Sequence, residues 1–107
     1  MLHKTDRLFA AATLFFLSAL MAPSQAADTS QGSRLYAKHC VRCHGANGSA
    51  TFPGVPDFRR SNNLFKSDQV LVQTVLNGSG MMPAFNGILE EKDILDVIAY
   101  LRMISQR

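Results

Sequence analysis

The sequence predicts an all-α domain with three main helices joined by long loops. Three stretches of the chain carry apolar residues at helical spacing, and none shows sustained strand alternation. The segments between these stretches are rich in glycine, proline, asparagine and serine, which favour loops. The chain has 107 residues, two cysteines and no tryptophan, and its formal net charge is +3. This length allows one folded domain and excludes a multidomain enzyme.

The first 26 residues differ in composition from the rest of the chain. Lys4 and Arg7 precede an uncharged apolar run from Leu8 to Ala22, and small residues follow at Ser24 and Ala26. A basic head, an apolar run and small residues before a cut are typical of a secretory signal peptide. We therefore expect residues 1–26 to be cleaved after Ala26. The alternative is an uncleaved anchor, although the apolar run is shorter than the roughly 20 residues that span a bilayer.

The remaining residues, 27–107, are expected to form the single domain. Their formal charge is +2, so the chain is nearly neutral after cleavage and does not have the basic excess of a nucleic-acid-binding protein. A domain of this size buries a small core and often depends on a disulfide, a metal or a cofactor.

The first helix is expected over about residues 30–40. Asp28, Thr29 or Ser30 can cap its free amide groups, because short polar side chains accept hydrogen bonds from the first turn.

The second helix is expected to begin after Ser67, a favourable N-cap that is followed by Asp68 in the first turn. Asn77 and Gly78 end it. Its apolar positions are Val70, Leu71, Val75 and Leu76.

The third helix has the clearest signal. Acidic residues favour its start through the helix dipole, and basic residues lie towards its end. Its apolar residues Ile94, Val97, Ile98 and Leu101 recur at i, i+3, i+4 and i+7.

Residues 41–66 form an unusually long loop between the first two helices. Such a loop in a compact domain usually carries function or wraps a ligand. It contains Gly45, Gly48, Pro53, Gly54 and Pro56.

Both cysteines lie in the sequence Cys40-Val41-Arg42-Cys43-His44, at the end of the first predicted helix. This is the C-x-x-C-H pattern of covalent c-type haem attachment. Two thiols at this spacing can bond the vinyl groups of one porphyrin edge, and the adjacent imidazole is placed as the proximal iron ligand.

Three other interpretations of the cysteine pair are weaker. A thioredoxin-type redox pair needs a βαβ setting, which the sequence does not indicate. A zinc site needs four ligands, and only His39 and His44 could join the two cysteines. A structural disulfide across C-x-x-C closes a very small loop and stabilises little.

A second axial ligand is available in the segment from Asn77 to Phe85. Met81 and Met82 lie there between glycines and Pro83. A thioether ligand favours ferrous iron and raises the reduction potential. The alternative is that both methionines fill gaps in the core, which is the commoner role of methionine.

The chain resembles the class I c-type cytochromes, which are small monohaem electron carriers. The resemblance rests on C-V-R-C-H-G at 40–45, on Pro56-Asp57-Phe58, on M-P-A-F at 82–85 and on the last helix, and it covers residues 30–104. It implies a cytochrome c fold, with three main helices and long loops around one covalently attached haem.

The resemblance also implies site residues. Cys40 and Cys43 would bind one haem c, and His44 and Met82 would be the axial iron ligands. The carbonyl of Pro56 would accept a hydrogen bond from His44, which orients the ring and makes it a better donor. Pro53 is the alternative acceptor.

Packing residues are implied as well. Gly32 and Tyr36 on the first helix would cross Val97 and Tyr100 on the last one, because glycine allows two helices to approach closely. One departure from the usual pattern is Glu90, which stands where a serine or threonine cap is expected.

These observations predict a periplasmic one-electron carrier that is not an enzyme. We expect it to be a monomer that meets redox protein donors and acceptors transiently, binds no nucleic acid and does not insert stably into a membrane after signal cleavage. A docking patch of basic residues is expected near one side of the haem. Its members are Lys38, Arg42, Arg59 and Arg60.

Two alternative functions remain open. The chain could be a dedicated cytochrome subunit or accessory protein of a respiratory or nitrogen-oxide-reducing complex. It could also be a haem enzyme or gas sensor with an open sixth site, although no distal acid, base or positioned arginine is evident.

Overall fold

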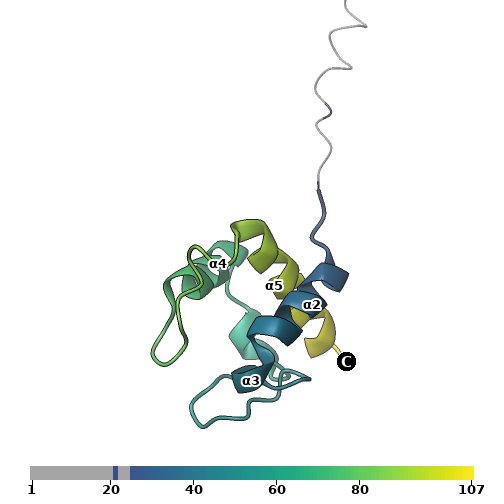
Figure 1. Cartoon of the computed structure of the whole chain (residues 1–107). Helices are drawn as coiled ribbons and strands as arrows, with labels where there is room; N and C mark the ends of the chain where they lie inside the picture. Colours follow the sequence, from purple (N-terminus) through teal and green to yellow (C-terminus); the bar gives the residue numbers. More distant parts are fainter. Residues whose placement is uncertain (1–20, 22–24) are drawn as a thin grey trace, which may run out of the picture.

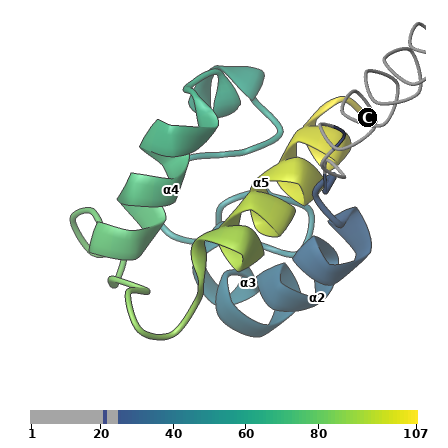
Figure 2. The same ribbon diagram turned by 90° about the horizontal axis from the view of Figure 1, so that it is seen from above.

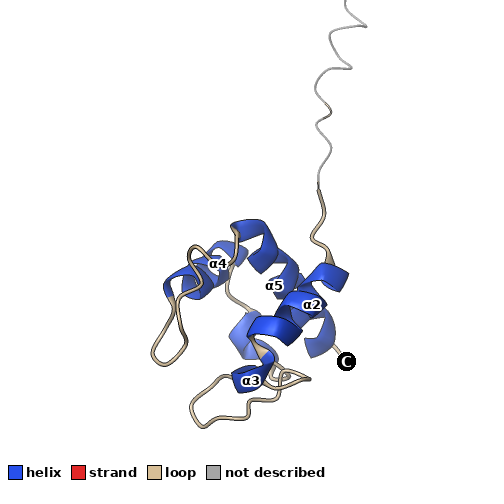
Figure 3. Ribbon diagram, viewed as in Figure 1, coloured by secondary structure: helices blue, strands red, loops and turns tan. Residues whose placement is uncertain are grey.

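A computed structural model describes Met21 and residues 25–107. The described part contains α2 (Thr29–His39), α3 (Val41–His44), the 3-10 helix η2 (Ser61–Leu64), α4 (Asp68–Asn77) and α5 (Glu91–Ser105). Figure 3 shows these helices joined by long loops, with no strand in the part that it colours by structure. The predicted all-α class is therefore confirmed. The three predicted helices correspond to α2, α4 and α5, and the predicted loop over 41–66 also contains α3 and η2.

The expected signal peptide, residues 1–26, lies almost entirely outside the described residues. Within the part of the chain that the structure describes, no helix is long and apolar enough to cross a membrane.

Helix α2 begins where a polar side chain caps its first turn. Of the three candidate caps, Asp28 fills the position, and its carboxylate accepts hydrogen bonds from the backbone N–H groups of Ser30 and Gln31 at 2.9 and 3.0 Å. Such a cap satisfies amide groups that have no partner within the helix.

Helices α2 and α5 cross at Gly32, as the resemblance implied (Figure 2). A Cβ atom at Gly32 would lie 2.0 Å from the carbonyl oxygen of Asp96, so only glycine fits at this crossing. The rings of Tyr36 and Tyr100 meet beside it with centroids 5.6 Å apart. The crossing therefore fixes the end of α2, which leads directly into the C-x-x-C-H sequence.

Helix α4 is capped by Ser67, as predicted. The Ser67 hydroxyl accepts from the backbone N–H of Val70 at 3.4 Å, and the helix ends before Gly78. Arg102 on α5 forms an ion pair with Asp68 and donates to the carbonyl of Lys66 at 3.0 Å. These contacts join the start of α4 to the last helix.

The start of α5 has a cap of a different kind from the serine or threonine that is usual there. The carboxylate of Asp93 accepts a hydrogen bond from the backbone N–H of Glu90 at 3.1 Å. This is the side-chain arm that reaches back from N3 in a capping box. Asp93 thus compensates in part for the absence of a hydroxyl at Glu90.

The core consists of two clusters that share α5. The first cluster joins α4, α5 and the segment between them through Val72, Phe85, Leu89, Ile94 and Ile98. The second joins α2, η2 and α5 through Tyr36, Leu64, Val97 and Leu101. The two loops that carry the predicted site residues are attached to different clusters.

One charged group lies inside the α2–α5 contact. The side chain of Asp96 is only 1% exposed, and it accepts from the backbone N–H of Asp28 at 2.7 Å and from Lys92 at 2.8 Å. Burial alone would raise the pKa of this carboxyl, but the two donors outweigh burial and hold the pKa below its usual value. Asp96 therefore holds the N-terminal end of α2 against α5.

Candidate haem site

The C-x-x-C-H sequence folds into a tight turn at the end of α2. The carbonyl of Cys40 accepts from the backbone N–H groups of Cys43 and His44 at 3.2 and 2.9 Å, and Gly45 donates to the carbonyl of Val41 at 2.8 Å. These bonds form the short helix α3, which is labelled in Figure 1. The turn places both thiols and the imidazole within one helical turn of each other.

The two thiols have different surroundings. Cys40 is half-buried and packs against the second cluster, whereas Cys43 is exposed. Burial raises the pKa of the Cys40 thiol to about 11, because the charged thiolate loses solvation. The two cysteines are not joined in a disulfide, so the disulfide interpretation gains no support.

The imidazole of His44 is held by the loop that follows it. Its ring stacks on the ring of Phe58, with centroids 4.6 Å apart and 22° between the planes. The buried Nδ1 atom has no hydrogen-bond partner among the described residues. Burial lowers the pKa of His44, and the carbonyl of Pro56 acts in the opposite direction. The carbonyl of Pro56 therefore lies close to this ring, although no hydrogen bond joins it to Nδ1.

The methionine pair lies in a tight turn after α4. Ser79 and Met82 pair through both of their backbone groups, at 3.1 and 2.9 Å. Met82 is half-buried and packs against the first cluster, whereas Met81 is 83% exposed. The following residues are fixed to α4, since Phe85 donates to the carbonyl of Val75 at 3.1 Å. The two methionines are thus clearly distinguished by their environment.

Gly78 allows this turn to fold back against the end of α4. It has a φ of 75°, and a Cβ atom there would lie 2.7 Å from the carbonyl oxygen of Met82 and 2.9 Å from the amide nitrogen of Ala84. A side chain at this position would displace the backbone that carries Met82.

The structure brings four predicted site residues together and leaves the fifth on another loop. Cys40, Cys43, His44 and Pro56 belong to one neighbourhood around α3, whereas Met82 is attached to the other cluster. Figure 1 shows the loop after α3 and the loop after α4 extending from the same side of the helices.

A contact that the sequence did not indicate joins these two parts. His39 is half-buried, and its ring meets the ring of Phe85 edge-on with centroids 5.8 Å apart. His39 directly precedes Cys40, and Phe85 follows Met82 by three residues. No sequence pattern identified this pair, because the contact depends on how the two loops are placed.

The residues fit a haem with one proximal imidazole. The chain presents two thiols on one turn beside an imidazole whose buried Nδ1 has no partner, and a thioether on a separate loop. Soft sulfur and imidazole donors are the ligands that haem iron accepts in cytochromes. The described residues contain no group of three or more His, Cys, Asp or Glu side chains that could hold an ion such as zinc.

The four basic residues of the expected docking patch lie at the surface. Lys38, Arg42, Arg59 and Arg60 are all exposed. Arg59 is partly neutralised, because it lies 3.6 Å from the carboxylate of Asp57 and donates to the hydroxyl of Ser49 at 2.9 Å.

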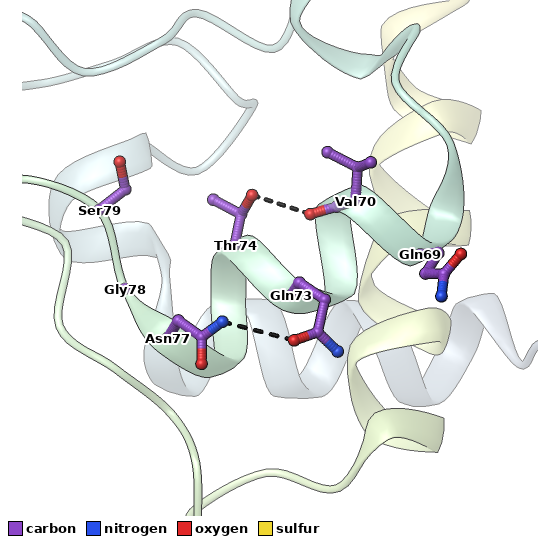
Figure 4. A pocket seen from close by; sticks show the side chains of 7 residues that line it. All are labelled: Gln69, Val70, Gln73, Thr74, Asn77, Gly78 and Ser79. Carbon is purple, nitrogen blue, oxygen red and sulfur yellow. Dashed lines mark hydrogen bonds between the residues drawn. The ribbon is translucent and has the colours of Figure 1, made fainter.

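Two open surface pockets lie elsewhere. One, of about 490 Å³, follows the outer face of α4 and is drawn in Figure 4. Its uncharged polar lining includes Gln69, Gln73, Thr74, Asn77 and Ser79. The second, of about 310 Å³, lies between the loop after α3 and the end of α5. None of the five predicted site residues lines either pocket.

Known proteins resemble most of this chain. The family model described as Cytochrome C oxidase, cbb3-type, subunit III matches residues 27–101. Cytochrome c6 of Picosynechococcus sp. is 32% identical over 74% of this chain and 75% of its own length. The cbb3-type cytochrome c oxidase subunit FixP of Bradyrhizobium sp. is also 32% identical, over 76% of this chain but only 29% of FixP.

A solved structure agrees with these relatives. The KustC0563 c-type cytochrome has a TM-score of 0.62 with this chain at 25% identity, over 68% of this chain and 95% of that one. The family match covers most of the chain, and the fold of the neighbour is the fold described above. The chain therefore belongs to the small class I c-type cytochromes, electron carriers with covalently attached haem c.

Proposed function

We propose that this protein is a periplasmic one-electron carrier in which Cys40 and Cys43 hold one haem c, and His44 and Met82 are its axial ligands. The observation that carries the proposal is the α3 turn, which presents both thiols beside an imidazole fixed against Phe58. When bound, haem supplies one-electron exchange at its iron. The protein's own residues bind the group, orient the imidazole and limit the access of water.

His44 is suited to act as the proximal ligand. Stacking on Phe58 restricts rotation of its ring. The buried Nδ1 needs an acceptor, and the Pro56 carbonyl is the neighbouring group that can provide it. An acceptor on Nδ1 fixes the tautomer and makes the other nitrogen a better donor.

Met82 is the better supported of the two methionines. It is half-buried in a turn whose backbone is paired, and Pro83 follows it directly. Met81 in the same turn points into solvent and is not held by the core. A thioether ligand would favour the ferrous state and raise the reduction potential.

The periplasmic location and the cleavage of the chain are proposed from the expected signal peptide, residues 1–26. Cleavage after Ala26 would leave a domain of residues 27–107, and the match to the family model begins at residue 27. That coincidence supports the proposed boundary. Covalent attachment of c-type haem in an exported compartment would also fit this signal peptide.

The partners would be redox proteins that dock transiently and exchange no chemical group with the chain, so the protein would not itself be an enzyme. Lys38, Arg42 and Arg60 offer exposed positive charge for such docking. Arg59 contributes less, because Asp57 pairs with it. Lys38→Gln and Arg42→Gln should each slow the reduction of the haem by an acidic donor at low salt. At high salt they should have little effect, because salt screens the attraction between exposed charges.

A potentiometric titration tests the function. The holoprotein should change between ferric and ferrous spectra reversibly with the slope of a single electron, and carbon monoxide should not bind the ferrous form promptly at neutral pH. Prompt binding of carbon monoxide would indicate an open sixth coordination site. This result would contradict the electron-carrier proposal and favour a haem enzyme or gas sensor.

A second candidate function is a dedicated subunit of a terminal oxidase. The name of the matching family model and the similarity to FixP favour it, although the chain corresponds to less than a third of FixP. Isolation of the protein from native membranes under mild conditions separates the two. A free carrier should be recovered in the soluble periplasmic fraction, whereas a subunit should migrate with an oxidase.

A further inference from the structure

The carbonyl groups at the end of α3 cannot be satisfied by the helix itself. Helix α3 spans only Val41–His44, so the carbonyls of Arg42 and Cys43 have no partner in a following turn. Thr51 supplies partners for both. Its Oγ1 lies 2.9 Å from the Arg42 oxygen and 3.1 Å from the Cys43 oxygen, and its backbone N–H donates to the Cys43 oxygen at 3.1 Å.

A second residue holds the turn from the other side. The hydroxyl of Tyr36, buried between α2 and α5, donates to the carbonyl of Gly45 at 2.6 Å. Burial raises the pKa of Tyr36, so its hydroxyl keeps its proton and acts as a donor. The turn is therefore fixed to α2 by Tyr36 and to the long loop by Thr51.

The same loop also holds the imidazole of His44. Phe58 stacks on the ring, and the backbone N–H of Phe58 donates to the carbonyl of Gly48 at 2.8 Å. Gly48 in turn donates to Gly45 at 3.3 Å. The same loop therefore contacts the site twice: Thr51 is hydrogen-bonded to the main chain of α3, and Phe58 stacks on the side chain of His44.

We propose that Thr51 is a positioning residue for the haem-attachment turn. By holding the carbonyls of Arg42 and Cys43, it sets the position of the Cys43 thiol and of the His44 imidazole. The inference rests on the proposed function in one respect, namely that His44 is the proximal ligand.

Thr51 allows a clean test because it is exposed and lies in a loop without regular structure. Valine has nearly the same shape as threonine but lacks the hydroxyl, so Thr51→Val removes the side-chain hydrogen bonds and leaves the core intact. Thr51→Ser keeps the hydroxyl. Ser105→Ala is a matched control, because it removes a hydroxyl that donates to the carbonyl of Arg102 at 2.9 Å, away from the attachment turn.

The readouts are amide hydrogen exchange and ring proton shifts in the ferrous holoprotein by NMR. In Thr51→Val, the amides of His44 and Gly45 should exchange roughly five- to tenfold faster, as expected for loss of about 1 kcal/mol of hydrogen bonding. The ring protons of His44 should shift. Thr51→Ser should restore both readouts, and Ser105→Ala should leave both unchanged.

The proposal is overturned if Thr51→Val leaves both readouts at their wild-type values, or if Thr51→Ser behaves like the valine variant. A separate measurement, the long-wavelength sulfur-to-iron band of the ferric protein, distinguishes failure of this proposal from failure of the proposed function. An intact band in all variants leaves His44/Met82 ligation standing whatever the role of Thr51, and absence of the band in the wild type argues against the ligation itself.

Discussion

The imidazole of His44 and the phenyl ring of Phe58 lie nearly parallel, with their centroids 4.6 Å apart. Phe58 packs in turn against the second core cluster. The orientation of the proposed proximal ligand is therefore set by the hydrophobic core, through a residue that lies 14 positions further along the chain.

Replacing Phe58 should loosen this arrangement. Phe58→Leu removes the aromatic stack and part of the contact with the second cluster, and should lower the free energy of unfolding by about 1–2 kcal/mol. Denaturant titration of the holoprotein measures the change. Phe65→Leu is the control, because Phe65 is 78% exposed and its replacement should cost much less. Equal losses for the two variants would show that the stack contributes nothing specific.

The methionine turn should depend on the absence of a side chain at Gly78. Gly78→Ala brings a methyl group to 2.7 Å from the Met82 carbonyl, so it should weaken or abolish the sulfur-to-iron band. Gly80→Ala is a matched control in the same turn, because Gly80 also has a positive φ but has no neighbour within 4 Å. If the two variants weaken the band equally, backbone strain and not the contact with Met82 is responsible.

The helix crossing should tolerate no side chain at Gly32. Alanine usually stabilises a helix relative to glycine by about 1 kcal/mol. At this position the methyl group would lie 2.0 Å from the Asp96 carbonyl, and we expect a net loss of about 1–3 kcal/mol instead. Thermal unfolding of the holoprotein measures it, with Lys38→Ala on the exposed face of the same helix as the control. A raised melting temperature for Gly32→Ala would contradict the close crossing.

The buried carboxylate of Asp96 should make stability depend on pH in one direction. Hydrogen bonds from Lys92 and from the backbone N–H of Asp28 lower the pKa of this carboxyl in the folded state. Its contribution to the free energy of unfolding is therefore complete above the usual carboxyl pKa of about 4 and is lost as pH falls through the lowered value. Asp96→Asn should therefore destabilise the protein at pH 7 and converge with the wild type in acid.

Denaturant unfolding at pH 7 and at pH 3 measures this difference, with Glu91→Gln as the exposed control on the same helix. A deficit for Asp96→Asn that is the same at both pH values would mean that the charge of the carboxylate does not contribute.

Local patterns predicted most of the regular structure. The caps at Asp28 and Ser67 and the periodic apolar residues of α5 define three helices through interactions within a few residues, which a sequence can reveal. The C-x-x-C-H motif and the methionine before proline are likewise local. The motif located the attachment turn, and the resemblance to a known family selected Met82 and Pro56.

Contacts between distant segments could not be predicted in this way. The edge-on contact of His39 with Phe85 and the hydrogen bonds from Thr51 to the carbonyls of α3 both depend on how the backbone is placed in space. His39 in particular lies at the end of α2, and its ring meets Phe85, which lies 46 residues further along the chain.

The assignment of the axial ligands is tested most directly by the visible spectrum of the oxidised holoprotein. The long-wavelength sulfur-to-iron band should be present in the wild type and in Met81→Ala, because Met81 is exposed and is not held by the core. It should be absent in Met82→Ala alone. A band that survives in Met82→Ala, or a wild type that lacks the band and binds external ligands at once, would contradict the proposed His44/Met82 coordination.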